Sequence, residues 1–246
     1  MINMEDINVH MFVYYESTGK FLIDRISELN PKLVYMSLVD DNLINKDITE
    51  YVKYKFDETR VLHVPNHGSD QYGFFHSFKQ DKENTSWILY THDKHPSKFE
   101  WLTDILDIYR DVDTSLLENK GTGMISAKKW KFTQPTFEEL SRMSNTSDFM
   151  YRKQHVESMQ TIIWLHELEK ILLAKHKIGD STMKYPIFCA GNIFLIRRNI
   201  LEKAHDCVYE DFFNPGVYRG DGEVQHGLER FYFYVSKCMG YENIFI

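Results

Sequence analysis

The chain has 246 residues, of which 43% are hydrophobic and 15% aromatic, and its formal net charge is −7. This length allows one sizeable domain with a real core. The negative charge provides no broad surface for nucleic acid, so no nucleic-acid partner is expected. The three cysteines form no paired motif, which favours the reducing cytoplasm. We see neither a signal peptide nor a transmembrane segment in the sequence. Any membrane association is therefore expected to be peripheral.

The first half of the chain alternates strands and helices. A dense β-branched and aromatic run over Val9–Tyr15 predicts a buried strand, and Ser17 is a candidate cap for the helix that follows. Further strands are predicted at Lys32–Val39, Arg60–Val64 and Trp87–Tyr90, and further helices at Asp47–Lys55, Ser69–Gln80 and Lys98–Tyr109. Four alternations with short connections predict an α/β, Rossmann-like fold: a mostly parallel central sheet flanked by helices on both faces.

The second half of the chain is less regular. It contains a polar segment over Gln134–Asp148, interpreted as a loop, and a long helical pattern over Gln154–Lys177. Strands are predicted at Thr122–Ala127, Phe188–Ile196 and Glu242–Ile246, the second with a break at Gly191–Asn192, and helices at Arg198–Ala204 and Glu223–Met239. No repeat or low-complexity linker divides the chain. We therefore expect a single domain over residues 1–246, with a nucleotide-binding front half (1–115) and an elaborated back half (116–246).

A polar loop follows the third predicted strand, with the sequence N-H-G-S-D. Gly68 allows close approach of a ligand to the backbone, and the side chains of Asn66 and Asp70 can bind sugar hydroxyls. Ligands of α/β sheets lie in the crevice beyond the carboxyl ends of the strands. The alternative interpretation is a capped turn in which Ser69 or Asp70 begins a helix.

The fourth predicted strand ends in a second polar cluster, H-D-K-H, which spans His92–His95. Such a cluster can bind a divalent metal, or Lys94 and the imidazoles can hold a diphosphate directly. The alternative is a strand end with solvated charges. Two neighbouring strands that both end in titratable clusters indicate one shared binding site.

The final predicted helix carries a third set of polar side chains. Glu223, His226 and Arg230 share one helical face, which can supply a general base and a phosphate-binding arginine. Asp221 lies in the R-G-D-G-E segment that leads into this helix. The alternative interpretation of this spacing is a row of ion pairs on the helix surface.

Taken in order, these segments resemble the rhamnan-synthesis-F-like group of polysaccharide glycosyltransferases. The resemblance rests on five motifs: N-H-G-S-D-Q-Y-G-F-F, T-H-D-K-H-P-S, G-T-G-M-I-S, A-G-N-I-F-L-I-R and H-G-L-E-R. Two positions depart from that family's pattern: Ser69 replaces its usual arginine and Asp93 replaces its threonine. No Asp-x-Asp metal motif follows the fourth strand.

The resemblance implies a GT-A-like fold and transfer of a sugar from a nucleotide-diphosphate-sugar donor to a glycan acceptor held by the back half. Mn²⁺ or Mg²⁺ held by Asp93 and His95 is one way to bind the diphosphate, and Lys94 without metal is the other. The remaining implied roles are contacts to the donor for Asp40, Asn66, Gly68, Asp70, His92, Lys94 and Arg230, and catalysis for Glu223, Asp221 and His226.

Two other functions fit the same residues. A metal-dependent hydrolase or phosphoesterase could use the His and Asp side chains of the two polar clusters as ligands. A non-catalytic glycan-binding module would need the pocket without the donor chemistry.

Overall fold

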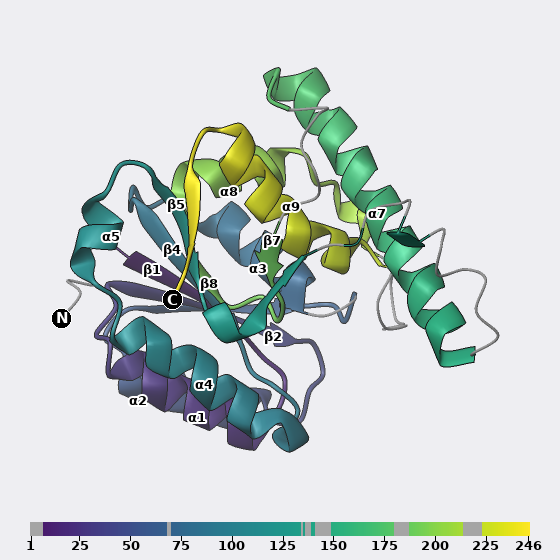
Figure 1. The fold of residues 1–246 in the computed structure, drawn as a ribbon. Helices are drawn as coiled ribbons and strands as arrows, with labels where there is room; N and C mark the ends of the chain where they lie inside the picture. The colour runs from purple at the N-terminus through teal and green to yellow at the C-terminus, as the bar shows by residue number, and fades with distance from the viewer. Residues whose placement is uncertain are drawn as a thin grey trace.

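The computed structural model of the chain describes residues 7–67, 70–133, 135, 139–140, 149–179, 187–213 and 223–246. The strands are β1 (Ile7–Val13), β2 (Leu33–Val39), β3 (Thr59–Val64), β4 (Trp87–His92), β5 (Thr122–Ser126), β6 (Lys131–Thr133), β7 (Ile187–Cys189), β8 (Phe194–Arg197) and β9 (Glu242–Phe245). Seven of them form a central sheet in the order β3-β2-β1-β4-β8-β5-β9, and β6 pairs with β7 in a small separate sheet (Figure 1).

The central sheet is mostly parallel. Strands β1 to β4 run parallel to one another, and β9 runs parallel to β5. Strand β8 is antiparallel to both of its neighbours, β4 and β5. Because β8 is reversed, its first residue, Phe194, pairs with Tyr90 near the end of β4. The turn that precedes β8 therefore lies at the same edge of the sheet as the polar cluster that follows β4.

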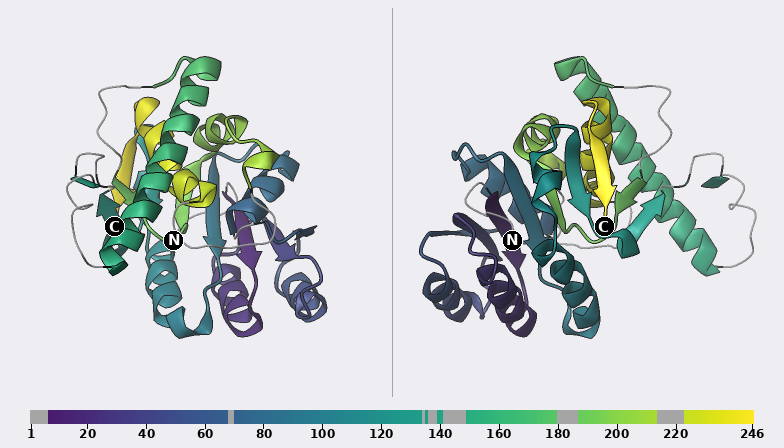
Figure 2. Two further views of the ribbon diagram at one scale, coloured as in Figure 1. Left: turned by 90° about the vertical axis from the view of Figure 1, so that its right-hand side faces the viewer. Right: turned by 60° about the vertical axis from the view of Figure 1, so that its left-hand side comes forward.

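The helices cover both faces of this sheet. Their bounds are α1 (Glu16–Ser27), α2 (Asn45–Lys55), α3 (Asp70–Gln80), α4 (Phe99–Arg110), α5 (Thr114–Glu118), α7 (Phe149–His176), α8 (Arg198–Asp206) and α9 (Val224–Cys238), with short 3₁₀ turns at Pro96–Lys98, Lys128–Trp130 and Glu210–Phe212. Helices α1, α2 and α4 pack together on one face, and α3, α8 and α9 cover the other (Figures 1 and 2). No helix in the described part of the chain is long and apolar enough to cross a bilayer.

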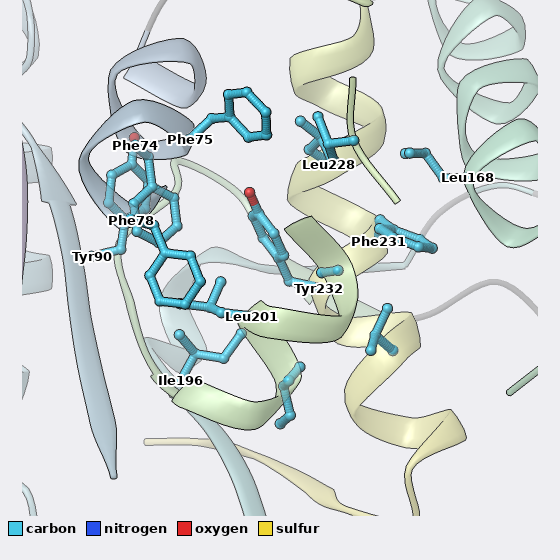
Figure 3. Close-up of a cluster of buried hydrophobic side chains, with 14 of the residues drawn as sticks. Phe74, Phe75, Phe78, Tyr90, Leu168, Ile196, Leu201, Leu228, Phe231 and Tyr232 are labelled. Atoms are coloured by element: carbon cyan, nitrogen blue, oxygen red, sulfur yellow. The ribbon is translucent and has the colours of Figure 1, made fainter. Parts of the chain in front are cut away.

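The larger core lies between the sheet and helices α3, α8 and α9. Aromatic rings dominate it: Phe74 stacks on Tyr90 of β4 with ring centroids 3.8 Å apart, and Tyr232 of α9 packs against the same group (Figure 3). Leu168 of α7 faces α9 from the outside, so α9 is covered by the sheet on one side and by α7 on the other. This double coverage explains why most residues of α9 are buried.

The predicted sheet flanked by helices is confirmed, two local predictions are wrong and one strand was not predicted. The segment predicted as one interrupted strand over Phe188–Ile196 is two strands, β7 and β8, which belong to different sheets. The strand that was not predicted is β6, which lies just before the segment interpreted as a loop. Helix α1 begins at Glu16, so Ser17 is inside its first turn, and Tyr15 at the cap position makes no side-chain cap bond.

Candidate functional site

A cavity of about 880 Å³ lies where β1 and β4 end and where β8 begins. Its walls come from the loops after β1, β3 and β4, from α4, from the β6–β7 sheet, from the turn before β8 and from the first turns of α9. Eight of the residues predicted from the sequence line it: Asn66, Asp70, His92, Asp93, Lys94, His95, His226 and Arg230. The two polar clusters and the final helix thus converge on one site.

The end of β4 places His92 and Lys94 side by side in this cavity. Nζ of Lys94 lies 2.8 Å from Nε2 of His92, and Nδ1 of His92 lies 2.7 Å from the carbonyl oxygen of Asp93. Burial, followed by the nearby charge of Lys94, lowers the pKa of His92 to about 4. The ring is therefore neutral at physiological pH and carries a single N–H. Nε2 also lies 2.7 Å from the carbonyl oxygen of Gly191, so this N–H serves one of the two carbonyls, and Nε2 accepts from Lys94 in the tautomer whose proton is on Nδ1.

The turn before β8 completes the surroundings of Lys94. The carbonyl oxygen of Gly191 accepts a hydrogen bond from Nζ of Lys94 at 3.1 Å, and the Gly191 N–H donates to Oε1 of Glu229 at 2.6 Å. Gly191 has φ of +96°, and a Cβ atom there would lie 2.8 Å from Cζ2 of Trp101. Glycine is therefore needed at this position both for its backbone conformation and for the close approach of the indole ring.

Asp70, the first residue of α3, joins the loop after β3 to the turn before β8. Its Oδ2 accepts hydrogen bonds from the Tyr90 hydroxyl at 2.8 Å and from Nδ2 of Asn192 at 3.0 Å. The same oxygen is 3.8 Å from Nε2 of His92. This carboxylate oxygen therefore connects three walls of the cavity: the start of α3, strand β4 and the turn before β8.

Asp93 fixes the loop between β1 and α1. Its Oδ2 accepts from the backbone N–H groups of Tyr14 at 3.1 Å and Tyr15 at 2.6 Å, and from the Thr18 hydroxyl at 3.4 Å. Two of these donors precede α1 and the third is in its first turn. Asp93 therefore holds the start of α1 against the end of β4, although the two segments are more than 70 positions apart in the sequence.

The described residues do not fit a divalent metal ion. Among them, no three His, Cys, Asp or Glu side chains lie close enough together to hold one. Oδ2 of Asp93 already accepts from the β1–α1 loop, and Nδ1 of His95 accepts from the Ser97 N–H at 3.2 Å. The ligand set that a metal-dependent hydrolase needs is likewise absent from this part of the chain. The metal role of Asp93 and His95 stays a prediction.

Helix α9 brings His226, Glu229 and Arg230 to the opposite wall. Nη1 of Arg230 donates to Oε2 of Glu229 at 2.9 Å and to the His226 carbonyl at 2.6 Å. The guanidinium lies 4.2 Å from the ring centroid of Phe188, which belongs to β7. Glu223 is the cap residue of α9, and its Oε2 accepts from Gln225.

Comparison with known proteins gives a family for this chain. The model of the family described as rhamnan synthesis protein F matches residues 1–241, which is nearly the whole sequence. The chain belongs to the rhamnan synthesis protein F family. This membership confirms the resemblance seen in the sequence motifs and associates the chain with polysaccharide synthesis. A search of curated proteins gave no match.

Four of the residues predicted for this member of the rhamnan synthesis protein F family are not among those that line the cavity. Asp40 is exposed directly after β2, and Glu223 lies at the start of α9 outside the cavity lining. Gly68 and Asp221 lie outside the described residues. The roles assigned to these four residues therefore stay predictions.

The aromatic residues that line the cavity of this rhamnan synthesis protein F family member were not predicted from the sequence. Trp101 of α4 stacks on Trp130 with ring centroids 4.2 Å apart, and its own ring lies 4.7 Å from Nζ of Lys94. Phe132 of β6, which is 47% exposed, and Phe188 of β7 also line the cavity. Their spacing in the sequence is that of ordinary core residues. Only the alternation of lysines and aromatic residues in the segment K-K-W-K-F could have indicated that Phe132 lies at the surface.

We expect Asp93 to make the stability of the protein depend on pH. Burial raises the pKa of Asp93 to about 7, although the hydrogen bonds from Tyr15, Tyr14 and Thr18 oppose this change. Between about pH 4 and pH 7 the folded protein then keeps a proton that the unfolded chain has released. The contribution of Asp93 to stability is therefore full below about pH 4 and is lost as the pH rises through about 7.

The Asp93→Asn variant tests this pH dependence, because it keeps an oxygen for the backbone N–H groups and removes the charge. Its free energy of unfolding in urea should match the wild-type value at pH 4 and exceed it by about 1–3 kcal/mol at pH 8. The exposed Asp57→Asn variant is the control and should follow the wild-type protein at both pH values. An Asp93→Asn variant that is less stable than the wild type at pH 8 would contradict the raised pKa of Asp93.

Proposed function

We propose that this chain is a glycosyltransferase of GT-A-like fold that moves a sugar from a nucleotide-diphosphate-sugar donor to a growing glycan. The observation that carries the proposal is the match of the rhamnan synthesis protein F family over residues 1–241. The position of the cavity supports it, because ligands of α/β sheets bind beyond the carboxyl ends of the strands. The cavity volume of about 880 Å³ is also within the range that holds a small-molecule ligand.

In this proposal the two sides of the cavity bind different substrates. The donor lies over the ends of β1 and β4, where Asn66, Asp70 and His92 line the wall. The glycan acceptor lies toward β6, β7 and α9, where the Phe132 ring is exposed and Arg230 is held by Glu229. Aromatic faces are suited to the apolar faces of sugar rings, which supports this orientation of the substrates.

The proposed reaction forms a bond from an acceptor hydroxyl oxygen to the anomeric carbon of the donor. The bond from that carbon to the diphosphate breaks, and its electron pair stays on the diphosphate oxygen. Inversion requires a base to take the proton of the acceptor hydroxyl. The candidate bases are His226, which lines the cavity, together with Glu223 and Asp221.

Thermal unfolding of the full chain with UDP, GDP and dTDP, in Mn²⁺ and separately in EDTA, tests this function. Binding to the folded state alone adds about 2.7 kcal/mol of stability at 100 times Kd. For a chain of this size we therefore expect a rise in Tm of roughly 5–10 °C with the preferred nucleotide. The corresponding nucleosides, which lack the diphosphate, are the control and should shift Tm much less.

The same experiment separates the proposed function from its two alternatives. A glycan-binding module would be stabilised by oligosaccharides and by none of the nucleoside diphosphates. A phosphoesterase would hydrolyse a simple phosphoester such as p-nitrophenyl phosphate and require metal to do so. If no nucleoside diphosphate shifts Tm in either buffer, and no UDP-, GDP- or dTDP-sugar is hydrolysed, the glycosyltransferase proposal is wrong.

A further inference from the structure

Lys94 is a buried cation whose hydrogen-bond partners are neutral. The residue is 9% exposed, its Nζ lies 2.8 Å from Nε2 of the neutral His92, and Nζ donates to the carbonyl oxygen of Gly191. Among the residues that the structure describes, no carboxylate oxygen lies within ion-pair distance of this Nζ. An ammonium group removed from water without a directly paired carboxylate is unfavourable. Burial lowers the pKa of Lys94 to about 8, although the negative charges of Asp70 and Glu229 oppose this change.

The acidic side chains around Lys94 are directed to other groups. Oδ2 of Asp70 accepts from Tyr90, and the two oxygens of Glu229 accept from the Gly191 N–H and from Arg230. Oδ2 of Asp93 accepts from the β1–α1 loop. The described carboxylates near Lys94 therefore accept hydrogen bonds from the walls of the cavity and make no direct ion pair with Lys94. The positive charge of Lys94 therefore faces a cavity that can admit an anion.

The same arrangement is unfavourable for a divalent cation. Mg²⁺ and Mn²⁺ prefer carboxylate and other oxygen ligands, whereas the oxygens named above are engaged by N–H and O–H donors. An ammonium group in the cavity wall also repels a second cation. Trp101, whose ring lies 4.7 Å from Nζ of Lys94, shields that side from water and strengthens electrostatic interactions there.

We propose that Lys94, and not a divalent metal ion, carries the charge of the donor's diphosphate, so that sugar transfer by this chain is independent of metal. This inference rests on the proposed function. As the bond from the anomeric carbon breaks, the negative charge that develops on the diphosphate oxygen is stabilised by the Nζ–H groups of Lys94. His92 is a positioning residue, since Nε2 of its ring, which accepts from Nζ when Nδ1 carries the proton, and the Gly191 carbonyl hold Nζ in the cavity wall before the donor binds.

Isothermal titration of the full chain with UDP, GDP, dTDP and inorganic pyrophosphate tests this proposal. We expect the Kd of the nucleotide that binds to change by less than about twofold between Mn²⁺ and EDTA. The Lys94→Met variant should weaken binding of that nucleotide and of pyrophosphate by about 10- to 100-fold, the effect of losing one charge-assisted hydrogen bond. Donor turnover should be equally resistant to EDTA.

Lys98→Met is the matched control, because Lys98 lines the same cavity and lies 5.7 Å from the same indole ring but is exposed. Its effect on Kd should be less than about threefold, as is typical of an exposed charge. The Tm of Lys94→Met should equal or exceed that of the wild type, because the variant buries no charge. Lys94→Gln is the second variant should the methionine side chain prevent folding.

The possible results separate this inference from the function on which it rests. If a nucleoside diphosphate binds only in Mn²⁺, or if Lys94→Met binds it as well as the wild type does, the role of Lys94 is wrong and the glycosyltransferase proposal stands. If none binds the wild-type protein in either buffer, both proposals fail. The comparison of Mn²⁺ with EDTA needs only the wild-type protein, so it decides the question even if both variants misfold.

Discussion

Replacing Arg198 with methionine should lower the free energy of unfolding by about 3–5 kcal/mol, as measured by urea denaturation at pH 7. Nη2 of Arg198 donates to Oδ2 of Asp81 at 2.7 Å, and the Asp81 side chain is completely buried. Although burial opposes it, hydrogen bonds from His10, Asn8 and Arg198 hold the pKa of Asp81 well below its usual range. The variant would leave this carboxylate buried without its cationic partner.

Two further variants establish the cause of that loss. Arg110→Met removes an arginine that is half exposed and ion-paired with Asp107, and it should cost less than about 1 kcal/mol. The double variant Arg198→Met/Asp81→Asn removes both charges and should be more stable than Arg198→Met alone. An Arg198→Met protein as stable as the wild type would show that the buried pair contributes little. The lowered pKa of Asp81 also predicts that wild-type stability is present above about pH 4 and is lost as the pH falls below it.

The Gly191→Ala variant should reduce both the stability of the fold and the binding of the donor nucleotide. At φ of +96° an alanine is strained, and its Cβ would lie 2.8 Å from Trp101, which must then move away from Lys94. We expect a loss of about 2–4 kcal/mol in the free energy of unfolding from strain and overpacking together. Nucleotide affinity should fall by about tenfold or more, because the Gly191 carbonyl orients Nζ of Lys94.

Gly240→Ala is the matched control for this variant. Gly240 has φ of +84°, and a Cβ atom there would have no neighbour within 4 Å. It therefore measures the backbone strain alone, which we expect to cost about 1 kcal/mol and to leave nucleotide affinity unchanged. If Gly191→Ala loses no more stability than Gly240→Ala, the contact with Trp101 does not constrain the site.

Most of the central sheet could be predicted from the sequence, because its strands are dense apolar runs separated by short helical patterns. Strands β1 and β2 are buried along their whole length, and such runs are typical of the centre of a parallel sheet. Strands β6 and β7 have three residues each, which is too short for a periodic pattern to be visible. The Gly191–Asn192 break was visible in the sequence, but nothing there indicates that the strand on each side joins a different sheet.

The polar residues of the candidate site could be predicted from the sequence, but their interactions could not. Asp93 was predicted as a metal ligand from its place after a strand, but nothing in the sequence indicates that its Oδ2 accepts from the distant β1–α1 loop. Trp101 was not predicted as a site residue, because its contact with Lys94 depends on how α4 packs. Pairings between distant segments of this kind depend on tertiary packing and leave no local pattern in the sequence.

The antiparallel strand β8 also affects how the protein folds while it is being synthesised. Strand β4 ends at His92 and its partner β8 begins at Phe194, so roughly 100 residues are translated after β4 before β8 emerges. At about 5–20 residues per second this takes roughly 5–20 seconds. During that time one side of β4 is an unpaired edge that can associate with other chains. The front half of the chain therefore gains its last neighbouring strand in the sheet only after most of the back half has been translated.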